Sequence, residues 1–210
     1  TTDTAGFTAA GAITQTTTSM LNLGGTSSMV VGTGDAITLT QSNNVFGGVL
    51  TLDAKSSDIV ATGALSIAGT LGSDGLRVTG DGAISFGTLS TGADLWVDTA
   101  GNISQTGTLT VSGVTTLAAG TTGDITLAQS GNEFGALVTL DSGDDVTLSD
   151  ASDLTLSGAS TGNLNVTTGD VLTLGTLTTG GDLVLSAAGA ITQENATDVL
   201  TISGTTTLTA

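Results

Sequence analysis

The chain has no cysteine, histidine, proline or tyrosine, and its 210 residues include a single tryptophan. Without cysteine or histidine it can form neither a disulfide framework nor a zinc or haem site of the ordinary kind. Catalysis by a serine–histidine or cysteine–histidine pair is excluded as well, because the base is missing. These absences rule out several large classes of enzymes and metalloproteins.

Positive charge is also scarce, since Lys55 and Arg77 are the only basic residues against 19 acidic ones, giving a net charge of -17. Such a charge repels phosphate backbones and anionic lipid surfaces, so we expect no nucleic acid partner and no binding to a membrane surface. Thr, Gly or Asp interrupts every apolar run well before the 18 or so residues that a membrane-spanning helix needs. We therefore expect no membrane insertion.

Aromatic residues make up only 2% of the chain, although its mean hydropathy is positive at +0.37. Leu, Ile, Val and Phe together form roughly a quarter of the residues, above the level of about 20% below which disorder is expected. A conventional globular core normally recruits aromatic residues for buried area. The composition therefore predicts an ordered chain with a narrow aliphatic core.

A long internal repeat organises the chain. Residues 87–105 (GTLSTGADLWVDTAGNISQ) align without a gap with residues 175–193 (GTLTTGGDLVLSAAGAITQ), 88 positions later. The chain thus holds about two and a third copies of one unit, which we expect to form a single continuous domain. Its parts are a partial repeat at 1–16, complete repeats at 17–105 and 106–193, and a partial repeat at 194–210.

A shorter period lies inside the long one. Segments of the form (Asp/Asn)-apolar-x-apolar begin at Asp124, Asp145, Asn163 and Asp182, at spacings of 21, 18 and 19 residues. Their alternation over four to six residues is typical of strands, and the Gly-rich ends are typical of tight turns. The pattern predicts an all-β fold, a parallel β-helix (β-solenoid) of about 18–21 residues per coil, with coils stacked about 4.8 Å apart.

The period-two alternation also predicts which side chains point inward. Phe46 and Phe134 occupy equivalent positions of the two copies and should plug the core, while Asn43, Asn44 and Asn132 should stack as amides at a corner. The aliphatic residues predicted to lie in the core are Leu127, Leu156, Val166, Leu174 and Leu185.

The densest acidic cluster comprises Asp144, Asp145, Asp150 and Asp153. It could be a calcium site or hold a carboxylate pair for glycoside hydrolysis. Aspartates of this kind are more often solvated turn residues that bond to their own backbone. We favour the turn role, and expect neither catalytic residues nor a cofactor, with calcium as the one candidate metal.

Three isolated side chains stand out against this background. Arg77 or Lys55 could hold a substrate, but lone cations at outward positions are usually ordinary surface residues, and we favour that interpretation. Leu95 and Val97 should point inward, so Trp96 between them should face outward. An outward tryptophan usually packs against its neighbours, but it could instead contact a partner. Trp96 is thus the candidate surface contact, with a host or matrix glycan as a candidate partner.

The units DITLAQSGNEFGALVTLDSGDDVTLSDASDLTLSGAS (124–160) and GGDLVLSAAGAITQ (180–193) resemble the β-strand repeats of large secreted bacterial adhesins of the filamentous haemagglutinin type. The resemblance covers essentially the whole chain. It implies a right-handed parallel β-helix shaft that a Gram-negative cell exports and displays as a fibre. The implied location is extracellular, at the cell surface.

These observations favour a structural, non-catalytic function as a shaft segment of an extracellular adhesin or surface filament. The alternative is a solenoid that binds or acts on polysaccharide, or one that binds ice, which the Thr-rich strings at 14–19 and 205–210 suggest. Both termini lie inside the repeat pattern, and a bare solenoid end exposes unpaired backbone groups. We therefore expect either end-to-end stacking with another copy or flanking coils from a longer parent chain.

Overall fold

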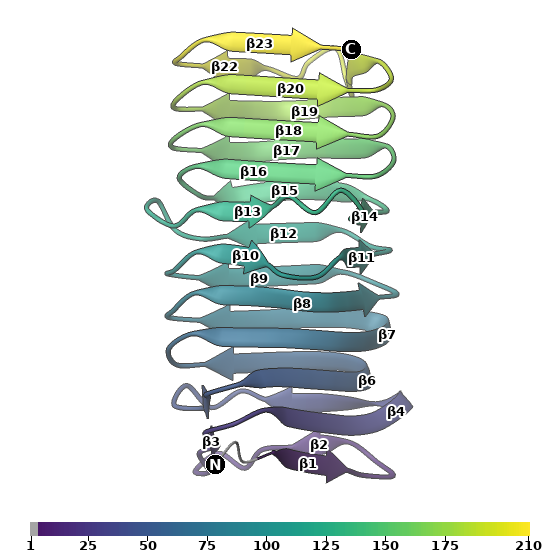
Figure 1. The fold of residues 1–210 in the computed structure, drawn as a ribbon, viewed down its shortest axis with the longest axis vertical. Coiled ribbons are helices and arrows are strands. Elements are labelled where there is room, and N and C mark those ends of the chain that lie inside the picture. Colours follow the sequence, from purple (N-terminus) through teal and green to yellow (C-terminus); the bar gives the residue numbers. More distant parts are fainter. Residues whose placement is uncertain (1–3) are drawn as a thin grey trace.

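The computed structural model describes residues 4–210, apart from the side chain of Thr33, and within that range no segment is helical. The chain winds into a rod of about 11 turns, with the strand at 5–8 at one end and the strand at 206–209 at the other (Figure 1). The predicted all-β parallel solenoid is therefore confirmed. In the described range no helix is long and apolar enough to cross a membrane.

Most coils are built of short strands separated by tight turns, as the alternating sequence segments predict. Three strands, at 27–39, 49–61 and 65–80, instead continue around a corner over 13, 13 and 16 residues. The strands are β1 (Ala5–Thr8), β2 (Ile13–Thr14), β3 (Asn22–Leu23), β4 (Ser27–Leu39), β5 (Val45–Phe46), β6 (Val49–Ala61), β7 (Leu65–Gly80), β8 (Ile84–Thr91), β9 (Leu95–Thr99), β10 (Ile103–Gln105), β11 (Leu109–Val111), β12 (Thr115–Ala118), β13 (Ile125–Leu127), β14 (Glu133–Phe134), β15 (Leu137–Ser142), β16 (Val146–Asp150), β17 (Leu154–Ser160), β18 (Leu164–Thr168), β19 (Leu172–Thr179), β20 (Leu183–Ala187), β21 (Ile191–Gln193), β22 (Leu200–Ile202) and β23 (Thr206–Thr209).

Each turn of the rod has two long sides. Strands β8, β16, β18, β20 and β23 lie on the near side in Figure 1, and β9, β12, β15, β17 and β19 lie on the far side. The near strands run to the right and the far strands return to the left while the chain rises, so the coil is right-handed. All the pairings between coils are parallel, as in β16 with β18 and β15 with β17.

Coil length varies more widely than the 18–21 residues expected. The shortest step joins Leu50 to Ile67, 17 positions later, and the longest joins Ile13 to Ile37, 24 positions later. The long coils contain a corner at which one side is split into two short strands, such as β10 and β11. Parallel stacking tolerates this variation because the extra residues bulge at the corners and leave the paired strands in register.

The 88-residue repeat spans about four and a half turns, as the register shows. Four steps between paired strands lead from Leu76 to Leu156 on the far side. The repeat equivalent of Leu76, however, is Leu164, which pairs with Val146 and Leu183 on the near side. Equivalent residues of the two copies therefore lie on opposite faces of the rod.

The core is a column of aliphatic side chains between the two sides, in which Phe86 is also fully buried. Full burial of one such side chain stabilises the fold by about 1.5–3 kcal/mol. The residues assigned to the core from the sequence are each at most 3% exposed: Phe46, Leu127, Phe134, Leu156, Val166, Leu174 and Leu185.

Buried amides hold the long coils together at their corners. The side chain of Asn132 exchanges two hydrogen bonds with that of Gln105, each 2.8 Å long, and Asn44 does the same with Gln15 at 2.6 and 2.9 Å. The predicted stack of asparagines is therefore wrong. Each buried asparagine pairs with a glutamine of the preceding coil, and Asn43 is exposed. Pairing satisfies both polar ends of the amide, which a buried site requires.

Candidate functional site

The tryptophan and the arginine lie next to each other on the far side of the rod. Parallel register aligns Thr38 of β4 with Asp58 of β6, Asp58 with Arg77 of β7, and Arg77 with Trp96 of β9. The residues that precede them in each strand, including Leu76, are buried. The period-two alternation therefore presents these four side chains outward in one row.

Arg77 is held between a carboxylate and an aromatic ring. Its guanidinium carbon lies 4.1 Å from the centre of the Trp96 ring, and its Nη1 lies 3.8 Å from Oδ1 of Asp58. The second distance is too long for a hydrogen bond, so Asp58 attracts Arg77 mainly through charge. The cation–π contact contributes about 0.5–1 kcal/mol at an exposed site. Trp96 itself is half-buried beneath this contact.

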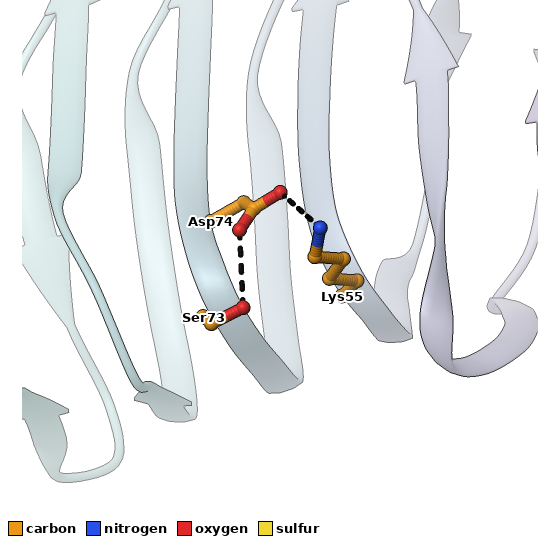
Figure 2. A network of polar contacts seen from close by, with 3 residues as sticks. All are labelled: Lys55, Ser73 and Asp74. Carbon is orange, nitrogen blue, oxygen red and sulfur yellow. Dashed lines mark hydrogen bonds and ion pairs between the residues drawn. The ribbon is translucent and has the colours of Figure 1, made fainter.

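The other cation lies at the same part of the rod. Lys55 Nζ is 2.8 Å from Asp74 Oδ2, and the hydroxyl of Ser73 donates to Asp74 Oδ1 at 3.0 Å, as Figure 2 shows. The hydrogen bond from Lys55, followed by that from Ser73, lowers the pKa of Asp74. The pair is well exposed to solvent, so its contribution to stability is small. Its effect is to keep Asp74 ionised and in place.

A groove of about 240 Å³ is lined by Asp58, Asp74, Arg77 and Trp96, among others, and Lys55 lies outside its lining. Two buried oxygens near this groove have no hydrogen-bond partner: Oδ1 of Asp58, and Oγ of Ser57, a residue that is 3% exposed and faces the core. Both belong to β6, whose alternation turns Ser57 inward and Asp58 outward at the edge of the groove. The outward residues that give the groove its chemistry are Thr38, Asp58, Arg77, Asp94 and Trp96.

The groove has negative charge despite its arginine. Lys55 pairs with Asp74, which leaves Asp58 and Asp94 with Arg77 as their one cation. Asp94 Oδ1 also accepts a hydrogen bond from the backbone N–H of Val114 at 2.8 Å. The arrangement offers hydroxyl and guanidinium donors beside carboxylate acceptors, which suits hydrogen bonding to a polar ligand but disfavours an anion.

Three of the four clustered aspartates bond to the next coil. Oδ1 of Asp145 accepts from the backbone N–H of Asn163 at 2.7 Å, Oδ1 of Asp153 from that of Val171 at 2.9 Å, and Oδ1 of Asp144 from the hydroxyl of Thr161 at 3.0 Å. Among the described residues, no group of three or more histidine, cysteine or acidic side chains is placed to hold a metal ion. These carboxylates join coils at the turns.

Asp150 differs from the solvated turn residue that the sequence suggested. It occupies an inward position two residues after Leu148 and is 3% exposed. Its carboxylate accepts hydrogen bonds from the backbone N–H groups of Phe134 and Ser152, both at 2.7 Å. Burial raises the pKa of Asp150 despite these bonds. Asp150 thus binds two backbone N–H groups at a corner of the core.

Sequence reasoning singled out Trp96 but interpreted Arg77 and Lys55 as ordinary surface residues. It did not place Asp58 beside Arg77. One signal was present in the sequence: the second copy has Asn165 where the first has Arg77 and Val184 where it has Trp96. The register between coils, which brings these residues together, was not available from that signal.

The fold defines this chain as a parallel β-solenoid repeat protein. A family model described as repeats of unknown function (DUF5649) matches residues 1–53, 72–141 and 168–210. These ranges cover more than half of the chain, so the chain belongs to this repeat family. A search of curated proteins found no match, and a search of solved structures found none either.

Proposed function

We propose that this chain is a shaft segment of an extracellular adhesin or surface filament of a Gram-negative bacterium, and that it is not an enzyme. The observation that carries the proposal is the uninterrupted parallel pairing of coils, from β1 with β4 to β20 with β23. At about 4.8 Å per coil, 11 turns give a rod of roughly 50 Å. The resemblance to adhesin repeats of the filamentous haemagglutinin type supports the extracellular location.

The charge distribution suits a rod that must stay separate from its neighbours. With 19 acidic and two basic residues, two rods that approach side by side repel each other at low ionic strength. Two rods that meet end to end do not need to bring their acidic sides close together. We therefore propose that the partners of this segment stack on its ends, as coils of a longer parent chain or as another copy.

Both end coils offer surfaces for such stacking. At the N-terminal end a hollow of about 300 Å³ is lined by Phe7, Ile13, Leu21, Met29 and Leu39. At the other end every residue of β23 is exposed, and Leu208 is 57% exposed. Apolar groups and unpaired strand edges at the ends favour addition of further coils of the same kind.

Two measurements test the proposal. Light scattering across a concentration series should show that the mass of the particles increases with concentration. Electron micrographs should then show rods that become longer and keep the same width. A mass fixed near 20.2 kDa would remove stacking between copies and leave coils of a parent chain as the partners. Antibodies to this segment should label intact cells that produce the parent protein, and labelling only after lysis would refute the extracellular shaft.

A further inference from the structure

A glutamine occupies the same corner in three turns of the rod, as Gln15, Gln105 and Gln193. Each ends a string of the form Gly-x-Ile-x-Gln: GAITQ at 11–15, GNISQ at 101–105 and GAITQ at 189–193. In all three the side-chain Nε2 donates to a backbone carbonyl of its own corner, that of Ser19 at 3.3 Å, Gly107 at 2.6 Å or Asp198 at 3.0 Å. The corner of the last turn is thus built like the two inner ones.

The two inner glutamines pair with the following coil, and the last one does not. The amides of Gln15 and Gln105 each exchange two hydrogen bonds with a buried asparagine of the next coil, Asn44 or Asn132. Gln193 is exposed, and within residues 4–210 its side chain makes one hydrogen bond, to the carbonyl of Asp198. Its carbonyl oxygen and its second N–H therefore remain available to another amide.

The apolar residues of the last turn are uncovered in the same way. β22 pairs with β19 as β11 pairs with β8, and β23 pairs with β20 as β12 pairs with β9, so β22 and β23 are the equivalents of β11 and β12. Leu109 and Leu117 of the inner turn are fully buried. Their equivalents are Leu200, which is half-buried, and Leu208, which is 57% exposed. The end face thus presents the apolar groups that a following coil covers inside the rod.

We propose that this end is covered by a coil of the type formed by residues 125–142, contributed by the parent chain, and that the asparagine of that coil pairs with Gln193. Inside the rod, β13, β14 and β15 cover β10, β11 and β12. The first copy covers its own corner with residues 37–47, which share the pattern Ile-Thr-Leu-x-Gln-Ser-x-Asn-x-Phe-Gly with residues 125–135. The inference rests on the proposed shaft and names the kind of coil that continues it.

The asparagine of such a coil would make two contacts at the corner. In the inner turns its Oδ1 also accepts a hydrogen bond from a backbone N–H, that of Leu21 at 3.1 Å or that of Leu109 at 2.9 Å. Leu200 is the equivalent residue of the last turn. One asparagine would therefore bind both the Gln193 amide and the Leu200 N–H, which gives a buried amide the partners that it needs.

The phenylalanine that follows the asparagine would cover the apolar part of the end. Phe134 pairs in register with Val111 and Phe46 with Leu23, and the two rings are only 2% and 3% exposed. The equivalent of Val111 in the last turn is Ile202. A phenylalanine of the added coil would therefore remove Ile202 from water, which is favourable for an apolar side chain.

A second copy of this chain is a poorer complement for the corner. The corner of its first coil holds Gln15, whose amide is already paired with Asn44 at 2.6 and 2.9 Å. That coil is of the type that contains β10, which inside the rod rests on β8, where Phe86 lies below Gln105. A second copy can therefore stack on this end only without the amide pair.

Lengthening the chain by one coil tests the proposal. One variant carries a second copy of residues 120–142 after Ala210, which is the equivalent of Ala119. A comparison variant carries residues 143–165, an extension of equal length without the Asn-x-Phe sequence. By NMR, we expect the first extension to slow hydrogen exchange of the Leu200 N–H at least about tenfold and the second to slow it less than about threefold. No slowing by the first extension, or equal slowing by both, would overturn the proposal.

A substitution in the extended chain separates the amide pair from general stacking of coils. With residues 120–142 added, Gln193→Ala should lose at least about fivefold of the protection at Leu200, whereas Thr207→Ala, at an exposed position of the same end, should lose none. Unchanged protection in Gln193→Ala would refute the pair. Exchange at Leu148 should stay the same in every variant, because it lies several coils away. The labelling of intact cells tests the extracellular shaft independently, so failure of the shaft and failure of this pair give different results.

Discussion

Replacing Asn132 by alanine tests whether the corner amides hold neighbouring coils together. Its Oδ1 accepts a hydrogen bond from the buried backbone N–H of Leu109 at 2.9 Å, and its Nδ2 lies 3.1 Å from the carbonyl of Leu127 and 3.2 Å from that of Ser149. Alanine leaves the Leu109 N–H without an acceptor, at a cost of about 1–3 kcal/mol. Lost bonds to the two carbonyls and to Gln105 add about 1 kcal/mol each. We expect the free energy of unfolding to fall by about 3–5 kcal/mol, since these terms are not fully additive.

Urea unfolding followed by far-ultraviolet circular dichroism measures this loss, and amide hydrogen exchange at Leu109 shows whether it is local. Because a solenoid can open coil by coil, exchange at Leu109 should accelerate more than exchange at Leu185, which lies several coils away. Asn43→Ala is the matched control, since Asn43 is exposed and should change stability by less than about 0.5 kcal/mol. A loss below about 1 kcal/mol for Asn132→Ala would show that the amide bonds are not needed at the corner.

Leu156→Asp places a charge at a fully buried position and should cost at least about 3 kcal/mol, whereas Val184→Asp, at an outward position, should change the melting temperature little. Burial raises the pKa of Asp150, so its contribution to stability is present below its unfolded pKa and is lost as pH rises through the folded value. The stability of the wild type relative to Asp150→Asn, from urea unfolding at pH 3 and pH 7, should therefore fall with rising pH. The hydrogen bond from the backbone N–H of Thr205 lowers the pKa of Asp182. The stability of the wild type relative to Asp182→Asn should therefore rise with pH. An equal slope for both would contradict these assignments. Gly158 has a φ of 118°, and a Cβ at this position would collide with the carbonyl oxygen of Leu140. Gly158→Ala should therefore lower the free energy of unfolding in urea by about 1–3 kcal/mol. An unchanged free energy of unfolding would show that the coil relaxes around the new side chain.

The groove was only partly accessible to sequence reasoning. Alternation around Leu95 and Val97 pointed Trp96 outward, and the structure places it half-buried in the outward row. Arg77 precedes it by 19 positions, close to one coil, but coil steps range from 17 to 24 residues. With that variation, spacing alone could not decide which side chains become neighbours across coils.

The strands, the turns and the solenoid could be predicted from the order of the residues alone. Period-two alternation, Gly-rich breaks and the narrow aliphatic composition are local properties, and each strand's inward face follows from its own residues. The same alternation carries Asp150 inward after Leu148, although its acidic character suggested a solvated turn residue. Burial is possible there because two backbone N–H groups at the corner bind its carboxylate.

Which side chains of different coils become neighbours depends on the folded rod. Corner insertions make the coils unequal, so the 88-residue repeat spans four and a half turns and its equivalent residues lie on opposite faces of the rod. Contacts between adjacent coils depend on the length of the coil that joins them, and that length varies from 17 to 24 residues. For this reason the row of Asp58, Arg77 and Trp96 exists only in the folded rod.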